Sequence, residues 1–167
     1  MINDISQLPF FDMKNCYDLF KKLEYDYSTL SRENMNCYYL MNFLATSNHL
    51  KDWVKNDKQI SEQIKSDLLK YFDLGRNKEF DVIKSLCNRS KHFEKSDYDY
   101  EKMKIEGFSF ANLDFGDVNF GGDEYFVQMD QEKINIFDIC EKNFMDWQAF
   151  FKKHEQELFA LGYVRTI

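Results

Sequence analysis

The sequence of 167 residues contains one proline and six glycines, so little in its composition interrupts helix formation. None of its four cysteines belongs to a C-x-x-C pair, which excludes zinc ribbons and thioredoxin-like redox motifs. It lacks a run of about 18 apolar residues and an opening of the signal-peptide type, so we expect no membrane span and no secretion. These absences favour a cytoplasmic protein with reduced thiols.

Aromatic residues make up 17% of the chain, far more than a disordered chain carries. The length suits one domain with its own hydrophobic core, and we expect residues 1–167 to form a single domain. The formal net charge is −7, so the phosphates of DNA would repel most of the surface. We therefore expect no broad DNA binding, although a local basic groove for nucleic acid is compatible with this charge.

Apolar residues recur at spacings of three and four through the first half of the chain, which predicts helices with one buried face. The expected helical core spans residues 14–93, with helices over 15–30, 33–55, about 58–74 and 78–93. Ser31 is the expected cap of the second helix and Gly75 the expected stop of the third. The second helix is apolar on two sides, which is typical of a central helix.

The second half of the chain has a different pattern. Residues 94–123 are rich in Asp, Gly, Asn and aromatics, and we expect an irregular loop with short strands there. Residues 124–137 read as a β-hairpin that turns at 130–132, and residues 138–160 read as a C-terminal helix that buries Trp147. The predicted fold is mainly α: a four- or five-helix bundle with a small β-hairpin insertion before the C-terminal helix.

The first motif of chemical interest is His49-Leu50-Lys51-Asp52-Trp53, on the predicted second helix. Positions three or four apart are neighbours on a helix surface, so Asp52 and Trp53 both lie near His49. Asp52 could hold the His49 ring in one tautomer. The alternative is structural, with His49 and Trp53 at a seam between helices and Asp52 in solvent.

The second motif, Cys87-Asn88-Arg89-Ser90-Lys91-His92, ends the predicted fourth helix. Asn88, Lys91 and His92 lie off the apolar face, and together they offer an amide, a fixed cation and a titratable base. The alternative is a solvated last turn, where Lys and His suit the negative end of the helix dipole. We expect His49 and His92 to share one polar cluster between the two helices.

A metal site is a further hypothesis, with less support from the sequence. His49, Asp52 and His92 could form a two-histidine, one-carboxylate set, but nothing in the sequence sets the two helices in that register. We therefore expect no metal and no cofactor. His154 lies in a Lys-Lys-His-Glu run and is expected at the surface. No nucleophile elbow, P-loop, dinucleotide fingerprint or HExxH motif is present.

The layout resembles a widespread group of uncharacterised bacterial and phage-associated proteins with an H-x-x-D-W helix, an N-x-x-K-H helix, a hairpin and a last helix bearing a tryptophan. The matching residues are His49, Asp52 and Trp53, then Asn88, Lys91 and His92, then Trp147. The resemblance covers roughly residues 35 to 155.

More distantly, the chain is similar to HEPN domains, which are all-α bundles, often dimeric, and in many cases metal-independent ribonucleases of defence and toxin–antitoxin systems. Their motif places His four to six residues after Arg, whereas only two residues separate Arg89 from His92 here. The resemblance thus implies either an active nuclease module or a divergent or inactive one. Because HEPN domains are often dimeric, it also implies that the protein could be a homodimer.

The leading expectation is a HEPN-like module of a bacterial or phage conflict system that binds or cleaves RNA. In a nuclease, His92 would act as general base or acid, Lys91 would stabilise phosphorane charge, and Asn88 would orient the substrate, with His49 and Asp52 completing the site. The alternative is a non-enzymatic, acidic interaction module that docks a protein partner through its aromatic, glycine-rich loop.

Overall fold

The computed structural model describes residues 13–32, 36–73, 75, 77–91, 103–106, 126–129 and 132–164. Within these residues the chain forms six helices and three strands. In chain order they are α1 (Cys16–Arg32), α2 (Cys37–Asn56), α3 (Glu62–Phe72), α4 (Lys78–Lys91), β1 (Met103–Glu106), β2 (Phe126–Met129), β3 (Glu132–Asn135), α5 (Ile136–Lys153) and α6 (Glu155–Ala160). The predicted mainly α bundle, with a hairpin before the C-terminal helix, is confirmed.

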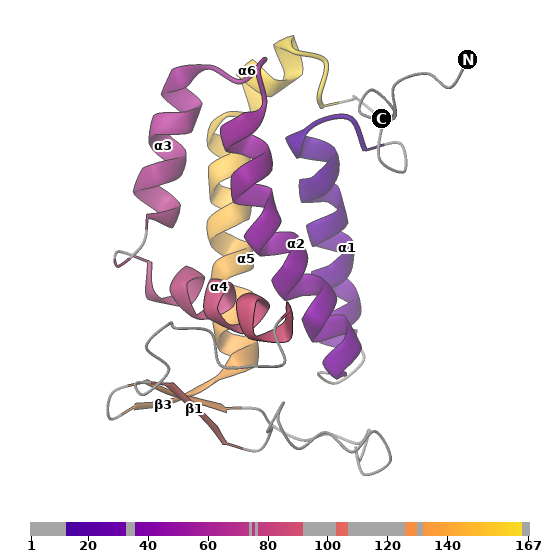
Figure 1. Ribbon diagram of the computed structural model, residues 1–167. Coiled ribbons are helices and arrows are strands. Elements are labelled where there is room, and N and C mark those ends of the chain that lie inside the picture. The colour runs from indigo at the N-terminus through magenta and orange to yellow at the C-terminus, as the bar shows by residue number, and fades with distance from the viewer. Residues whose placement is uncertain are drawn as a thin grey trace, which may run out of the picture.

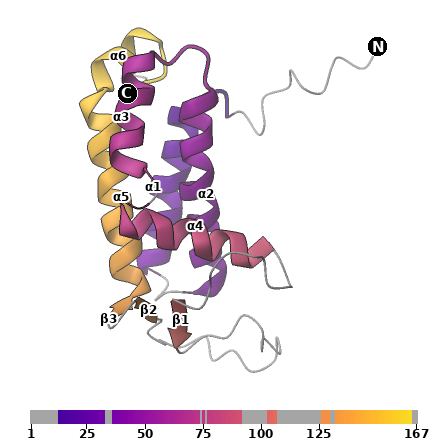
Figure 2. The ribbon, with the colours of Figure 1, turned by 60° about the vertical axis from the view of Figure 1, so that its left-hand side comes forward.

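Four helices run along one axis and one crosses them (Figures 1 and 2). α1, α2, α3 and α5 lie lengthwise, and α4 runs across the bundle and packs against α2 and α5. The strands lie at one end of the bundle, next to the start of α5, and α6 lies at the other end. α2 contacts four other helices, α1, α3, α4 and α5. Its expected central place is thus confirmed.

The buried face of α2 is the one predicted from its periodicity. The six predicted residues Leu40, Phe43, Leu44, Ser47, Leu50 and Val54 are buried, and so is Thr46. The expected second apolar face is covered only in part, because Tyr38 is 53% exposed and His49 is exposed. Other helices therefore cover one side of α2, and the side that carries His49 faces solvent.

Several helix ends differ from those predicted. Ser31 belongs to the last turn of α1, and Asn36 caps α2 instead, because its Oδ1 accepts the Tyr38 N–H at 2.9 Å. The C-terminal helix predicted over 138–160 begins earlier, where Asn135 Oδ1 accepts the Phe137 N–H. It is also interrupted at His154, which separates α5 from α6. In both caps a short polar side chain satisfies a backbone donor that the helix leaves unpaired.

The strands form an antiparallel sheet in the order β1-β2-β3. The hairpin is shorter than predicted, and it pairs Val127 with Ile134. β1 comes from the stretch 94–123, for which short strands were expected, and pairs Ile105 with Val127. The rest of that stretch lies outside the described residues.

The helices and the sheet share one hydrophobic core, with Trp147 of α5 among its largest fully buried side chains. The Trp147 ring stacks on Phe72 with centroids 3.8 Å apart, and Phe72 meets Phe80 of α4 edge-on. Among the described helices, none is both long and apolar enough to cross a bilayer.

Trp147→Ala is expected to lower the free energy of unfolding by about 3–5 kcal/mol, because it empties a fully buried site that the core cannot refill. Met145→Ala is the matched control on the same helix. Met145 is 53% exposed, so its loss should cost no more than about 0.5 kcal/mol. Urea unfolding measures both. Equal costs for the two variants would contradict the burial assigned to Trp147.

Candidate functional site

The first motif lies in the C-terminal half of α2. Leu50 and Val54 are fully buried, whereas His49 and Asp52 are exposed one turn apart. Trp53 is half-buried and packs against the core. The structural alternative therefore applies to Trp53, while the histidine and the carboxylate lie on the solvent side of the helix.

Lys51 lies within the same motif, but on another side of α2. Its Nζ donates a hydrogen bond to the backbone oxygen of Phe72, at the end of α3, and lies 5.1 Å from the centre of the Phe80 ring of α4. Burial lowers the pKa of Lys51, and repulsion by Lys84 of α4 adds to this effect. Lys51 therefore joins α2 to α3 and α4, whereas His49 lies about 200° away around the helix axis.

The second motif ends α4. Cys87 is buried, Asn88 is half-buried, and Lys91 is the last residue of the helix. His92 lies outside the described residues. The structure thus brings the two helices that carry the motifs into contact. The expected cluster of His49 with His92 stays a prediction.

A buried polar network links α2 to α5. Ser47 Oγ donates to Asn143 Oδ1 at 2.6 Å, and Trp147 Nε1 donates to Ser47 Oγ at 3.0 Å. Ser47 and Asn143 are completely buried. The signal in the sequence is a polar residue in an otherwise apolar helical stripe. Such residues must find partners inside the core.

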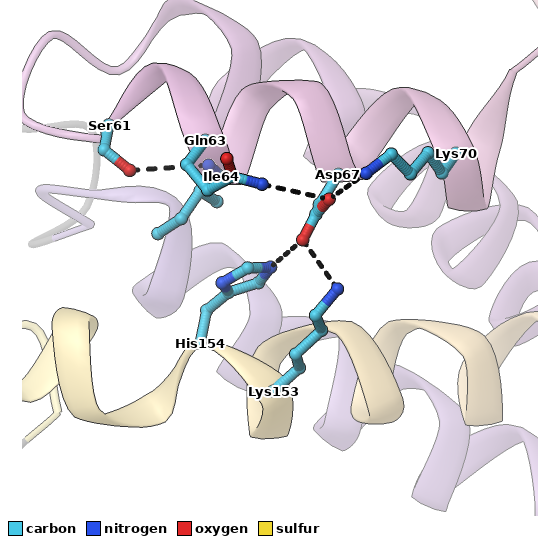
Figure 3. Close-up of polar contacts among 7 residues, drawn as sticks. All are labelled: Ser61, Gln63, Ile64, Asp67, Lys70, Lys153 and His154. Atoms are coloured by element: carbon cyan, nitrogen blue, oxygen red, sulfur yellow. Dashed lines mark hydrogen bonds and ion pairs between the residues drawn. The ribbon is translucent and has the colours of Figure 1, made fainter.

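A second buried cluster joins α3 to the end of α5 (Figure 3). Asp67 is 2% exposed and accepts hydrogen bonds from Lys153 Nζ at 2.6 Å, Lys70 Nζ at 2.7 Å and Gln63 Nε2 at 3.3 Å. The hydrogen bonds from Lys153 and Lys70 lower the pKa of Asp67 to about 2. Such a carboxylate stays ionised at neutral pH, so it suits a structural ion pair better than proton transfer.

His154 borders this cluster, and its expected place at the surface is wrong. Its side chain is 9% exposed, its Nε2 lies 3.5 Å from Asp67 Oδ2, and its ring meets Phe150 edge-on. Lys152 and Glu155 are exposed, whereas His154 lies where α5 ends and its ring points towards Asp67 of α3 (Figure 3). Local composition could not reveal that orientation.

No group of three His, Cys, Asp or Glu side chains gathers at metal-binding distance in the part of the chain that the structure describes. Comparison of the chain with protein-family models, curated proteins and solved structures finds no match. The chemistry of the site must therefore be argued from its own residues. Of the site residues predicted from the sequence, His49 and Asp52 are exposed on α2, and Asn88 is half-buried near the end of α4.

Asp67→Asn should lower the melting temperature at neutral pH, because it removes the charge that two lysines share across α3 and α5. The Asp67 pKa is lowered from 3.8 to about 2, so its stabilising effect is present above 3.8 and is lost as the pH falls towards 2. The deficit of the variant should thus be constant down to about pH 5 and shrink below pH 3.8.

Glu62→Gln is the matched control, since Glu62 is on the same helix and pairs with Lys65 but is 89% exposed. Exposed ion pairs contribute little, so this variant should melt close to the wild type. Thermal melts across the pH range measure both variants. An equal effect of the two substitutions, or a deficit of Asp67→Asn that does not change with pH, would contradict the role given to Asp67.

Proposed function

We propose that the protein is a HEPN-like module of a bacterial or phage conflict system and that it binds or cleaves RNA. The observation that carries the proposal is the exposure of His49 and Asp52, one turn apart on the helix that packs against α4. Both side chains are exposed, so a ligand in solvent can reach the imidazole and the carboxylate.

Three other polar side chains of the bundle contrast with this pair. Ser47, Asn143 and Asp67 are buried and bonded between helices, so their chemistry is used in holding the fold. Asn88 is only half-buried, and α4 ends within one turn of it. We therefore expect a nucleic acid to contact the side of α2 that carries His49 and Asp52, and the end of α4 near Asn88.

The chemistry that fits these residue types is RNA cleavage without metal. A general base removes the proton of the 2′-hydroxyl, the 2′-oxygen attacks phosphorus, and the 5′-oxygen leaves with a proton from a general acid. This leaves a 2′,3′-cyclic phosphate on one product and a free 5′-hydroxyl on the other. His92 is our candidate for one of the two proton transfers, Lys91 for charge stabilisation, and Asn88 for substrate orientation.

His49 and Asp52 supply the second proton transfer only if α2 and α4 present one site. The carboxylate of Asp52 would then hold the imidazole of His49 in one tautomer. If the site belongs to α4 alone, the same pair is a separate contact for the RNA. Variants at the two histidines separate these cases.

The test is cleavage of single-stranded and structured RNA by the purified protein with a chelator present. We expect His92→Ala to reduce the rate by about two to four orders of magnitude, as loss of a general acid or base does. Its melting temperature should change little, since His92 is off the predicted apolar face. Gln148→Ala, an exposed position on α5, is the control and should cleave like the wild type.

A comparable loss of rate in His49→Ala indicates one site shared by both helices, and an unchanged rate confines the site to α4. Wild-type protein that neither binds nor cleaves any of the RNAs contradicts the proposal. That result would favour the acidic interaction module, whose docking loop at 94–123 lies, apart from β1, outside the described residues.

A further inference from the structure

The last described residues of the chain close one end of the bundle. This terminal cap, Glu155–Val164, consists of α6 and the turn that follows it, and lies at the end opposite the sheet (Figure 1). Leu158 is 1% exposed, and the Tyr163 hydroxyl donates to both carboxylate oxygens of Asp57 at 2.9 Å. Asp57 ends α2, so the cap is fastened at its far end to another helix.

The near end of the cap is fastened by a single residue. His154 is the only residue between α5 and α6, and its backbone is bent there with φ −104° and ψ 11°. Its buried side chain lies between Phe150 on α5 and Asp67 on α3. His154 therefore connects the start of α6 to α5 through the backbone and to α3 through its side chain.

The buried site of the His154 ring favours the neutral imidazole over the charged one. Nε2 of His154 is buried and makes no hydrogen bond within the described structure, because its 3.5 Å separation from Asp67 Oδ2 is too long for a good one. The Asp67 carboxylate already accepts hydrogen bonds from Lys153, Lys70 and Gln63. A charged imidazole would thus be buried beside a carboxylate whose lone pairs are largely taken.

We propose that His154 is a pH-sensitive lock for the terminal cap, closed while its ring is neutral and released when the ring is protonated. A protonated ring gains more from water than from this site, so it moves outward. Because His154 joins α5 to α6 and its ring lies against Asp67 of α3, that movement releases the start of α6 and exposes the part of the core on which Leu158 packs.

Burial sets the direction of the effect on the pKa of His154, because the charges around the ring act in opposite directions. Burial is the largest cause and lowers the pKa of His154 below its usual 6.5; Lys153 lowers it further, while Asp67 on α3 and Glu157 on α6 oppose. The closed state therefore binds the proton less well than the open state. Closure is fully favoured above about pH 6.5 and weakens as the pH falls below that value.

The neighbouring groups do not titrate in the same range. The pKa of Asp67 is about 2, so this carboxylate keeps its charge throughout. Burial, together with the hydrogen bond to Asp57, raises the pKa of Tyr163, so its hydroxyl keeps its proton. A change of cap opening between neutral and mildly acidic pH can thus be assigned to His154.

The experiment is amide hydrogen exchange of the full chain at about pH 7.5 and about pH 5.5, corrected for the intrinsic effect of pH on exchange. Protection of residues 155–164 in the wild type should fall by up to about tenfold at the lower pH, the limit set by one proton over about one pH unit. A peptide from the buried part of α2, Leu40–Val54, serves as reference and should keep its protection.

Two variants complete the test. His154→Gln cannot be protonated and should show no fall in cap protection between the two pH values. Tyr163→Phe loses the hydrogen bond to Asp57, so its cap should exchange faster at both pH values, with the same fall as the wild type. A titration of the His154 ring by NMR in the wild type should give a pKa below 6.5 whether or not the variants fold.

Equal cap protection at both pH values in the wild type would overturn the proposal. So would a ring pKa at or above 6.5, or a fall of equal size in the α2 reference, which would indicate global loosening. A pH-dependent fall that persists in His154→Gln would place the proton elsewhere.

Discussion

The packing and hydrogen bonding of Trp147 are the constraint on which the rest of the bundle depends. Its ring stacks on Phe72 at the end of α3, and its Nε1 donates to Ser47 in the middle of α2. One fully buried side chain thus fixes α5 against two helices at once, by an apolar contact and by a directional bond. A slide or rotation of α5 would break both, and would leave an indole N–H unpaired in the core.

That constraint decides which side of α2 faces outward. With Ser47 bonded to Trp147 and Asn143, Leu50 and Val54 continue the same buried face. The positions opposite, which include His49 and Asp52, are left to solvent. The exposed histidine and carboxylate are therefore a consequence of how the core is fastened, and they remain exposed as long as the network holds.

The same core positions α4. Phe72, which carries the Trp147 ring on one side, meets Phe80 of α4, and Lys51 of α2 lies over Phe80 while it bonds the Phe72 carbonyl oxygen. Asn77, just before α4, donates to Asp146 of α5. The crossing of α4 over α2 is thus set at its N-terminal half.

Much of this could be predicted from local spacing. The buried face of α2, with Ser47 among its apolar residues, follows from its 3.6-residue period, and so do the existence of the helices and of the hairpin. The bond from Lys153 to Asp67 could not be predicted, because it joins residues 86 positions apart. The burial of His154 could not be predicted either, because it depends on where α5 breaks. Whether His49 faces His92 depends on the angle between two helices, which no local pattern encodes.

The most direct test of this account is a double-mutant cycle between Ser47→Ala and Trp147→Phe, read by urea unfolding. Trp147→Phe keeps an aromatic ring against Phe72 but removes the donor to Ser47, so the cycle isolates the hydrogen bond from the stacking. The account predicts a coupling of about 0.5–1.5 kcal/mol, typical of a buried hydrogen bond. Additive effects, with a coupling near zero, would contradict the claim that this bond fastens α5 to α2.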